Sequence, residues 1–160
     1  MKKVPDFYNN LEEIKKEIQS LLIRGVKDRK SNFHNIVFNT INLVNQPEAR
    51  VVVLRGFCAN EFSIKIHSDR RAKKIKEIKK NKSVSMVFYD YKKKIQLRVR
   101  GNATIDKNPL ESWKKLSNWS RRCYLTINSP GLEAKKPTPG FPEEFAFQAP
   151  SDEQSEDGLK

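Results

Sequence analysis

Five short segments carry the residue pattern of β-strands, and their spacing constrains the fold more than any other feature of the chain. The segment 33–43 is apolar and β-branched, 50–57 contains a nearly continuous apolar run, and 62–66 alternates apolar with polar residues. The segments 83–89 and 94–105 complete the set. Connections of hairpin length favour antiparallel pairing, and the continuous run predicts a strand covered on both faces. We therefore predict a mainly β protein with flanking helices, whose antiparallel sheet forms a small barrel.

Three further segments have helical patterns. Residues 10–24 place apolar side chains at steps of three and four, and Gly25 is the expected stop. Residues 70–80 predict a second, very basic helix, and Pro109 suits the first turn of a third that carries Trp113. The sequence contains no run of about 18 apolar residues, the length that a transmembrane helix needs.

Charge is distributed unevenly along the 160 residues, which carry a formal net charge of +13. Residues 133–160 hold three basic and seven acidic side chains, whereas residues 1–132 hold 29 basic and 12 acidic ones, a net of +17. We predict one domain with an N-terminal helix over 1–132 and a Pro-rich acidic tail, loop or disordered, over 133–160. The basic part favours an anionic partner: nucleic acid, an acidic membrane surface or a phosphorylated small molecule.

The two cysteines, Cys58 and Cys123, are far apart in the sequence and follow no C-x-x-C pattern. This usage is typical of a reducing compartment, so we expect a cytoplasmic protein. With two histidines at no ligand-like spacing, the chain does not predict a metal site.

Three groups of polar residues stand out against the strand pattern. Arg50 and Arg55 bracket the apolar run Val51–Leu54 at an odd spacing, so they point to opposite sides of a strand. Either both cap the strand at a barrel rim, or one of them grips a phosphate. The stretch His67–Lys74 predicts a phosphate site at a helix start, with a solvated basic face as the alternative. Gln96 offers a donor and an acceptor to a heterocycle, or is simply an exposed strand residue.

Taken in order, these groups resemble the pyridoxamine 5'-phosphate oxidase family, whose members have an FMN-binding split barrel. The resemblance covers roughly Phe33–Gly131 and rests on Arg-x-Val-x-Leu-Arg, then Ser-Asp-x-Arg-x-x-Lys, then Gln-x-Arg-x-x-Gly. It is closer to the general flavin-binding branch of the family than to the vitamin-pathway enzyme. It implies an antiparallel split β-barrel over residues 1–132.

The resemblance also implies a function: an FMN-dependent oxidoreductase that passes a hydride between FMN and a small-molecule substrate, with phosphorylated substrates among the candidates. FMN would lie at the subunit interface of a homodimer, with no membrane partner and no metal. Ser68, Arg71 and Lys74 would hold the phosphate, and Gln96 would meet the isoalloxazine ring. The full set of implied flavin contacts is Arg50, Val51, Val52, Val53, Leu54, Arg55, His67, Ser68, Arg71, Lys74 and Gln96. No catalytic residue is assigned.

The sequence departs from the family pattern in four places, of which the mildest is Ser68 in place of the usual Thr, a change that keeps the hydroxyl. Ala72 stands where the family usually has Ser, which removes one phosphate hydrogen bond. The vitamin-pathway enzyme holds its substrate phosphate with a Tyr, an Arg and a Ser, and the Arg and Ser are not in place in Trp113–Arg121, so pyridoxamine-phosphate oxidation is not supported. Relatives continue with further strands beyond the position where this chain stops, so we expect one or more C-terminal strands of the barrel to be missing.

Two other interpretations fit the composition. One is a non-enzymatic basic barrel that binds nucleic acid through Lys73–Lys82, with Phe88, Tyr89 and Tyr91 stacking on bases. The other is a degenerate flavin-fold protein that no longer binds flavin. Because the basic residues converge on one strand–helix junction, a compact phosphate is favoured and nucleic acid is not the expected partner.

Overall fold

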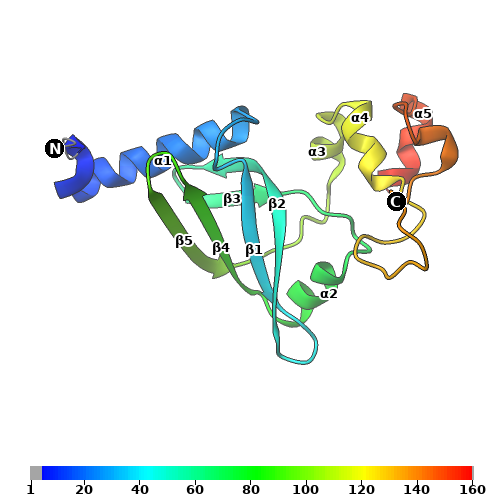
Figure 1. Cartoon of the computed structure of the whole chain (residues 1–160), viewed down its shortest axis with the longest axis horizontal. Helices are drawn as coiled ribbons and strands as arrows, with labels where there is room; N and C mark the ends of the chain where they lie inside the picture. Colours follow the sequence, from blue (N-terminus) through cyan, green and yellow to red (C-terminus); the bar gives the residue numbers. More distant parts are fainter. Residues whose placement is uncertain (1–4, 160) are drawn as a thin grey trace. The chain divides into compact units, whose positions relative to one another are not determined.

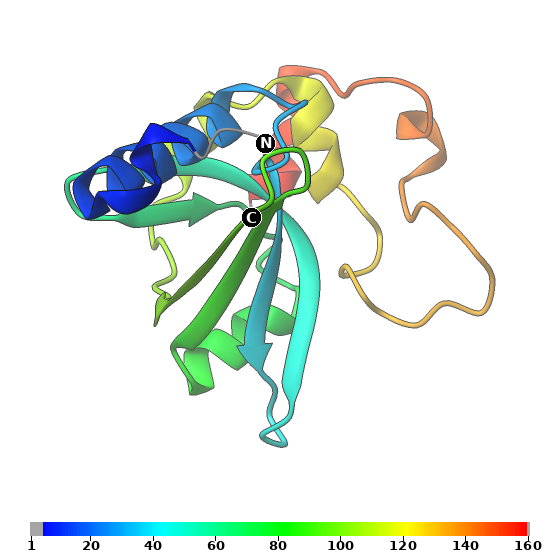
Figure 2. The same ribbon diagram turned by 60° about the vertical axis from the view of Figure 1, so that its left-hand side comes forward.

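The five predicted strands form one antiparallel sheet in the computed structural model, which describes residues 5–159 (Figure 1). The strands are β1 (Asn35–Ile41), β2 (Pro47–Cys58), β3 (Ser63–Ile66), β4 (Ser83–Asp90) and β5 (Ile95–Asn102). Their order across the sheet is β3-β2-β1-β4-β5, and the sheet is strongly curled (Figure 2). The prediction of a mainly β, antiparallel fold with flanking helices is confirmed. Residues 1–4 and 160, where the predicted domain begins and the predicted tail ends, lie outside the described residues.

The helices are short apart from the first. They are η1 (Asp6–Asn9), α1 (Leu11–Lys27), α2 (Lys73–Lys80), α3 (Leu110–Lys114), α4 (Asn118–Arg121), η2 (Arg122–Tyr124), η3 (Glu143–Phe145), α5 (Asp152–Ser155) and η4 (Glu156–Leu159). The predicted helix after Pro109 is interrupted at Ser117, whose side chain accepts the N–H of Ser120 and starts α4 as a new helix. The predicted helix after Pro109 is present as α3, which carries Trp113, and the cap at Ser117 begins a further helix that the sequence pattern did not separate from it.

The chain divides into two compact units. The sheet unit comprises the residues up to His67 together with Lys80–Ala103, and the helical unit comprises Ser68–Lys79 together with the residues from Thr104 onward. Residue 132, the limit predicted from composition, therefore lies inside the helical unit. The acidic segment 133–160 is part of that unit and contains η3, α5 and η4.

Alternating side chains from neighbouring strands make the core of the sheet unit. Ile36 and Phe38 of β1, Leu54 of β2 and Phe88 of β4 are all almost completely buried. Phe33, just before β1, packs on Phe88 with a distance of 5.2 Å between ring centroids. This burial is the main stabilising contribution to the sheet, since each such side chain is worth about 1.5–3 kcal/mol.

Gly25 lies inside α1 and does not end it, so the predicted stop was wrong. The helix continues to Lys27, and Gly25 is buried where α1 passes close to the chain before β1. A Cβ at this position would come within 2.8 Å of the Phe33 carbonyl oxygen and 3.0 Å of Leu54 Cδ2. The carbonyl of Gly25 also lies 2.7 Å from His34 Nδ1. Glycine is therefore required here by close approach and not by helix termination.

One face of the sheet is open, which corrects the prediction that the apolar run of β2 is covered on both faces. Val51 pairs with Val37, Val37 with Val87, and Val87 with Arg98, so all four side chains point to the same face. Val51 is 68% exposed and Val37 38% exposed. Tyr89, two residues from Val87 on the same face, is also exposed. We call these five residues the open face.

Candidate functional site

The strand β2 divides its predicted site residues between the two faces of the sheet. Arg50 pairs with buried Phe38 and its guanidinium donates to the hydroxyl of buried Thr40, so it lies on the core face. Val51 lies on the open face. Arg55 is exposed, at an irregularity where the register of β2 against β3 shifts between Leu54 and Gly56. The odd spacing of the two arginines therefore separates them as predicted, and the shift in register adds a bend that the sequence pattern did not indicate.

Gln96, in β5, lies on the same side of the sheet as the open face. It pairs with Tyr89 of β4, is exposed, and stands two residues from Arg98. Two of the predicted flavin contacts from different parts of the sheet unit, Val51 and Gln96, thus share one face. Arg50 does not share it.

His67 follows β3 in a strongly basic environment. Burial lowers the pKa of His67 from its usual value, and the positive charges of Arg55 and Lys65 lower it further. The imidazole is therefore neutral at pH 7 and sits where two cations raise the local potential. Such a place attracts an anion, as the sequence motif predicts.

The start of α2 brings two of the predicted phosphate residues together within the helical unit. Lys74 Nζ donates to Ser68 Oγ over 3.1 Å, and both side chains are half-buried. The first turn of α2 contains no acidic residue, so the partial positive charge of the helix N-terminus is not offset there. Ala72, which stands where the family has Ser, is almost fully buried. A hydroxyl, an ammonium and backbone N–H groups suit a phosphate.

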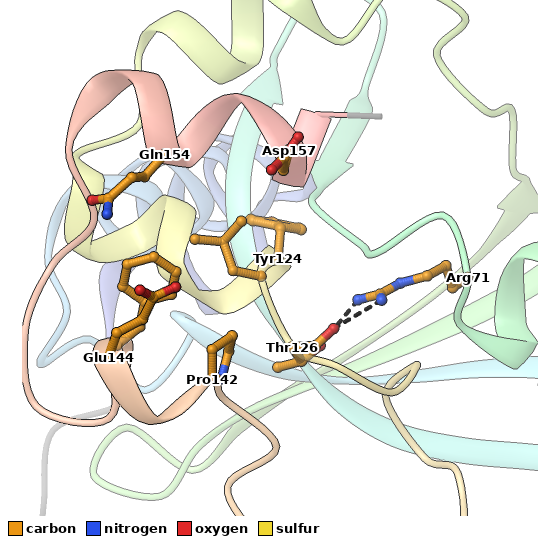
Figure 3. Close-up of a pocket in the computed structure, with 9 residues that line it drawn as sticks. Arg71, Tyr124, Thr126, Pro142, Glu144, Gln154 and Asp157 are labelled. Atoms are coloured by element: carbon orange, nitrogen blue, oxygen red, sulfur yellow. Dashed lines mark hydrogen bonds between the residues drawn. The ribbon is translucent and has the colours of Figure 1, made fainter.

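Arg71, the third predicted phosphate residue, is already engaged. Its guanidinium forms a salt bridge of 2.7 Å with Asp69, and it also donates to the carbonyl of Thr126 over 2.8 Å and to the hydroxyl over 3.0 Å (Figure 3). Burial alone would raise the pKa of Asp69, but hydrogen bonds from the side chain and backbone of Arg71 hold it below its usual range. An anion therefore reaches this guanidinium only in competition with Asp69 or Thr126.

The segment that holds Arg71 from the other side carries no signal in the sequence. Thr126 lies 55 positions after Arg71, and no motif marks it. The Asp69-x-Arg71 spacing does indicate the contact between those two residues, because an Asp side chain often accepts the backbone N–H two residues later in the chain. The same part of the helical unit holds a pocket of about 340 Å³, which was not predicted either.

The structure weakens the nucleic-acid interpretation. Of the three aromatic residues that would stack on bases, Phe88 is completely buried in the core, while Tyr89 and Tyr91 are exposed.

Within residues 5–159, no group of three or more His, Cys, Asp or Glu side chains is placed to hold a metal. No helix in this described part of the chain is long and apolar enough to cross a membrane.

A protein-family model matches more than half of this chain. The model described as pyridoxamine 5'-phosphate oxidase, FMN-binding domain, matches residues 15–107. This range contains every residue that the motif reading assigned to flavin.

Sequence relatives carry names from the same family. A pyridoxine/pyridoxamine 5'-phosphate oxidase from Leptospira biflexa is 32% identical over 79 residues, which is 49% of this chain and 36% of that protein. The pyridoxine/pyridoxamine 5'-phosphate oxidase 2 of Arabidopsis thaliana is 31% identical over 103 residues, or 64% of this chain and 52% of that protein. The chain thus spans about a third to a half of the length of these relatives.

Two solved structures share the fold. A pyridoxamine 5'-phosphate oxidase-related, FMN-binding protein from Nostoc punctiforme superposes with a TM-score of 0.60 at 19% identity, covering 88% of this chain and 76% of that one. PhzG from Burkholderia lata, in complex with tetrahydrophenazine-1-carboxylic acid, gives a TM-score of 0.64 at 13% identity and covers 83% and 66%. At such low identity these likenesses bear on the fold alone, and they agree with the predicted split barrel.

Proposed function

Because the chain belongs to the pyridoxamine 5'-phosphate oxidase FMN-binding domain family, we propose that it binds FMN and acts as an FMN-dependent oxidoreductase. The observation that carries this proposal is the Ser68–Lys74 pair at the start of α2, inside the matched range. FMN, when bound, supplies the redox chemistry. The substrate of the reaction is a small molecule that the family match does not identify. A cytoplasmic location is part of the proposal and rests on the low cysteine content.

The residues that the resemblance assigns to the flavin belong to both units, and each group is described within its own unit. In the helical unit, Ser68 and Lys74 bind the phosphate, and Arg71 joins them by giving up part of its bonding to Asp69 or Thr126. In the sheet unit, His67 lies in the positive potential of Arg55, and Gln96 offers its amide to the ring system. In this proposal the flavin is also lined by the β2 residues that the motif implies, which are Arg50, Val51, Val52, Val53 and Leu54.

We further propose a homodimer in which a second copy covers the open face. Val51, Val37 and Tyr89 expose apolar surface on adjacent strands. Contiguous apolar surface of this kind on a sheet marks an interaction site more often than a free surface. A partner on this face would also cover Gln96 of β5, in keeping with a flavin shared between subunits.

A titration of the purified protein with FMN, followed by the quenching of flavin fluorescence, tests the cofactor. We expect saturable binding and a visible absorption band that persists after free FMN is removed. Lys74→Ala is expected to weaken binding by at least about tenfold, since it removes a charged hydrogen-bond donor. Arg71→Ala is expected to cost less, because Arg71 is engaged by Asp69 and Thr126.

The matched control is Lys79→Ala, which removes the same charge from an exposed position of the same helix. Equal weakening in Lys74→Ala and Lys79→Ala would show that FMN responds to total charge and not to a site. A wild-type protein that quenches no flavin fluorescence would contradict the proposed function.

A further inference from the structure

The guanidinium of Arg71 presents two different edges to two different partners. The edge formed by Nε and one terminal nitrogen faces Asp69, with a salt bridge of 2.7 Å. The edge formed by the two terminal nitrogens faces Thr126, whose carbonyl and hydroxyl oxygens accept hydrogen bonds of 2.8 Å and 3.0 Å (Figure 3). Together these contacts use four of the five N–H groups of the side chain. All three residues belong to the helical unit.

A phosphate that binds Arg71 displaces Thr126 more easily than Asp69. Arginine binds phosphate best through two parallel N–H groups, so the ligand needs one whole edge of the guanidinium. Asp69 is charged, its side chain is only 8% exposed, and it also accepts the backbone N–H of Arg71 over 2.7 Å. Thr126 offers two neutral acceptors, which bind a guanidinium less strongly than a bidentate carboxylate does. The edge at Thr126 is therefore the edge that a phosphate can take.

The contact at Thr126 connects the start of α2 with the acidic segment 133–160. The next residue, Ile127, donates its N–H to the carbonyl of Gly140 over 2.8 Å. Gly140 has a φ of +74°, and a Cβ at this glycine would lie 3.8 Å from the Cβ of Thr126. The acceptors that hold Arg71 are thus fixed in place by a neighbouring part of the same unit.

We propose that the chain at Thr126 is an internal competitor of FMN. It occupies the phosphate-binding edge of Arg71, and bound FMN displaces it while Asp69 keeps the other edge. The inference rests on the proposed function and deepens it, because it names what regulates binding at that site. By linkage, the contact at Thr126 lowers the affinity for FMN by the same factor by which FMN weakens the contact.

A titration of the full chain with FMN, followed by the quenching of flavin fluorescence, tests the proposal in the wild type and two variants. Thr126→Val keeps the branched shape and removes the hydroxyl acceptor, so we expect it to bind FMN about twofold to fivefold more tightly. Thr104→Val is the matched control. Thr104 is exposed in the same unit and is not a partner of Arg71 within residues 5–159, so its substitution should leave the affinity unchanged.

Hydrogen exchange of the Ile127 amide gives a second measurement, which requires no substitution. This N–H is bonded to Gly140, so its exchange reports local opening of the chain next to Thr126. Saturating FMN removes Arg71 from Thr126 in this proposal, and the exchange should become faster by a similar factor, about twofold to fivefold.

Equal FMN affinities of the two threonine variants would overturn this inference, and if their binding is saturable the proposed function would still stand. Weaker binding by Thr126→Val would also overturn it, since the hydroxyl would then support the site. Unchanged or slower exchange of the Ile127 amide at saturating FMN would do the same. Absence of FMN binding in all three proteins would overturn the proposed function, and this inference with it.

Discussion

At the scale of single residues, the environment of a side chain decides its role more than its type does. Arg71 and Lys74 are both basic and close in sequence, yet Lys74 contacts Ser68 and Arg71 is held by Asp69 and Thr126. His67 would be an ordinary histidine in solution, and burial beside Arg55 and Lys65 makes it resist protonation. Gly25 has its role because a neighbouring carbonyl leaves no space for a Cβ.

The lowered pKa of His67 predicts how stability depends on pH. Because the folded state binds the proton less tightly than the unfolded chain, the contribution of His67 is fully present above about pH 6.5. It is lost as pH falls below that value, where the unfolded state takes up the proton first. We expect urea unfolding to show a decrease in the free energy of unfolding between pH 7.5 and 5.5 that His67→Gln reduces. An identical pH dependence in the variant would contradict the assigned environment.

Bound FMN should raise the pKa of His67 from its lowered value. A phosphate near His67 would offset the charges of Arg55 and Lys65 and favour the imidazolium. We therefore expect the His67 pKa, followed by NMR, to rise when FMN saturates the protein. A pKa that stays unchanged at saturation would place the phosphate elsewhere.

Gly25→Ala tests the close approach of α1 to the chain before β1. The added Cβ would lie 2.8 Å from the Phe33 carbonyl oxygen, so backbone must shift, and we expect a loss of about 1–3 kcal/mol in the free energy of unfolding. Gly101→Ala in β5 is the control, because a Cβ there meets nothing within 4 Å. Chemical denaturation of the two variants should separate them clearly; similar stabilities would contradict the steric argument.

At the scale of elements, β2 is the strand that contributes residues both to the core and to the proposed site. It pairs with β1 on one side and β3 on the other, and its register against β3 shifts next to Arg55. Its core-face residues pack beneath the sheet, while Val51 stands on the open face. One strand therefore serves the core and the proposed interface with alternate residues.

Val51→Glu tests the proposed dimer. A carboxylate in the centre of an apolar contact between two copies would be costly to bury, so we expect sedimentation to show monomers where the wild type is a dimer. The control is Val44→Glu, in the exposed connection between β1 and β2 and away from the open face. A wild type that is monomeric at all concentrations, or a Val51→Glu protein that remains dimeric, would exclude this face as the interface.

At the scale of the whole molecule, the chain combines a curled sheet unit with a helical unit that includes the acidic C-terminal segment. Within the helical unit, Arg121 bonds Asp152 and Ser155, and Gly158 lies against the ring of Trp113. Trp113 in turn packs edge-on against Tyr124 with a distance of 5.5 Å between ring centroids. The segment that composition describes as a tail is thus part of the packing around Trp113.

Removal of residues 133–160 should expose Trp113. In a Trp119→Phe background, where Trp113 is the single fluorophore of its kind, we expect the emission maximum of the truncated protein to move to longer wavelength. The β-sheet signal in circular dichroism should persist, because the strands lie in the sheet unit. An unchanged emission maximum would show that the segment does not cover Trp113.

The sequence by itself determined the number and approximate limits of the strands, the first two helices and the family motif. These are local patterns: alternation in β5, three- and four-residue steps in α1, and the spacing from Arg50 to Gln96. They can be recognised in the sequence because the direction of the side chains repeats with the period of the helix or strand, independently of the rest of the chain.

Only the tertiary structure decided the features that depend on residues far apart in sequence. Gly25 meets Phe33 and Leu54, Arg71 meets Thr126, and the side chain of Val51 is left 68% exposed on the open face. A pattern of apolar residues predicts which side chains are buried, but it does not predict which other segment packs against them. For the same reason the pocket that joins Arg71, Glu144 and Asp157 became visible only once the chain was folded.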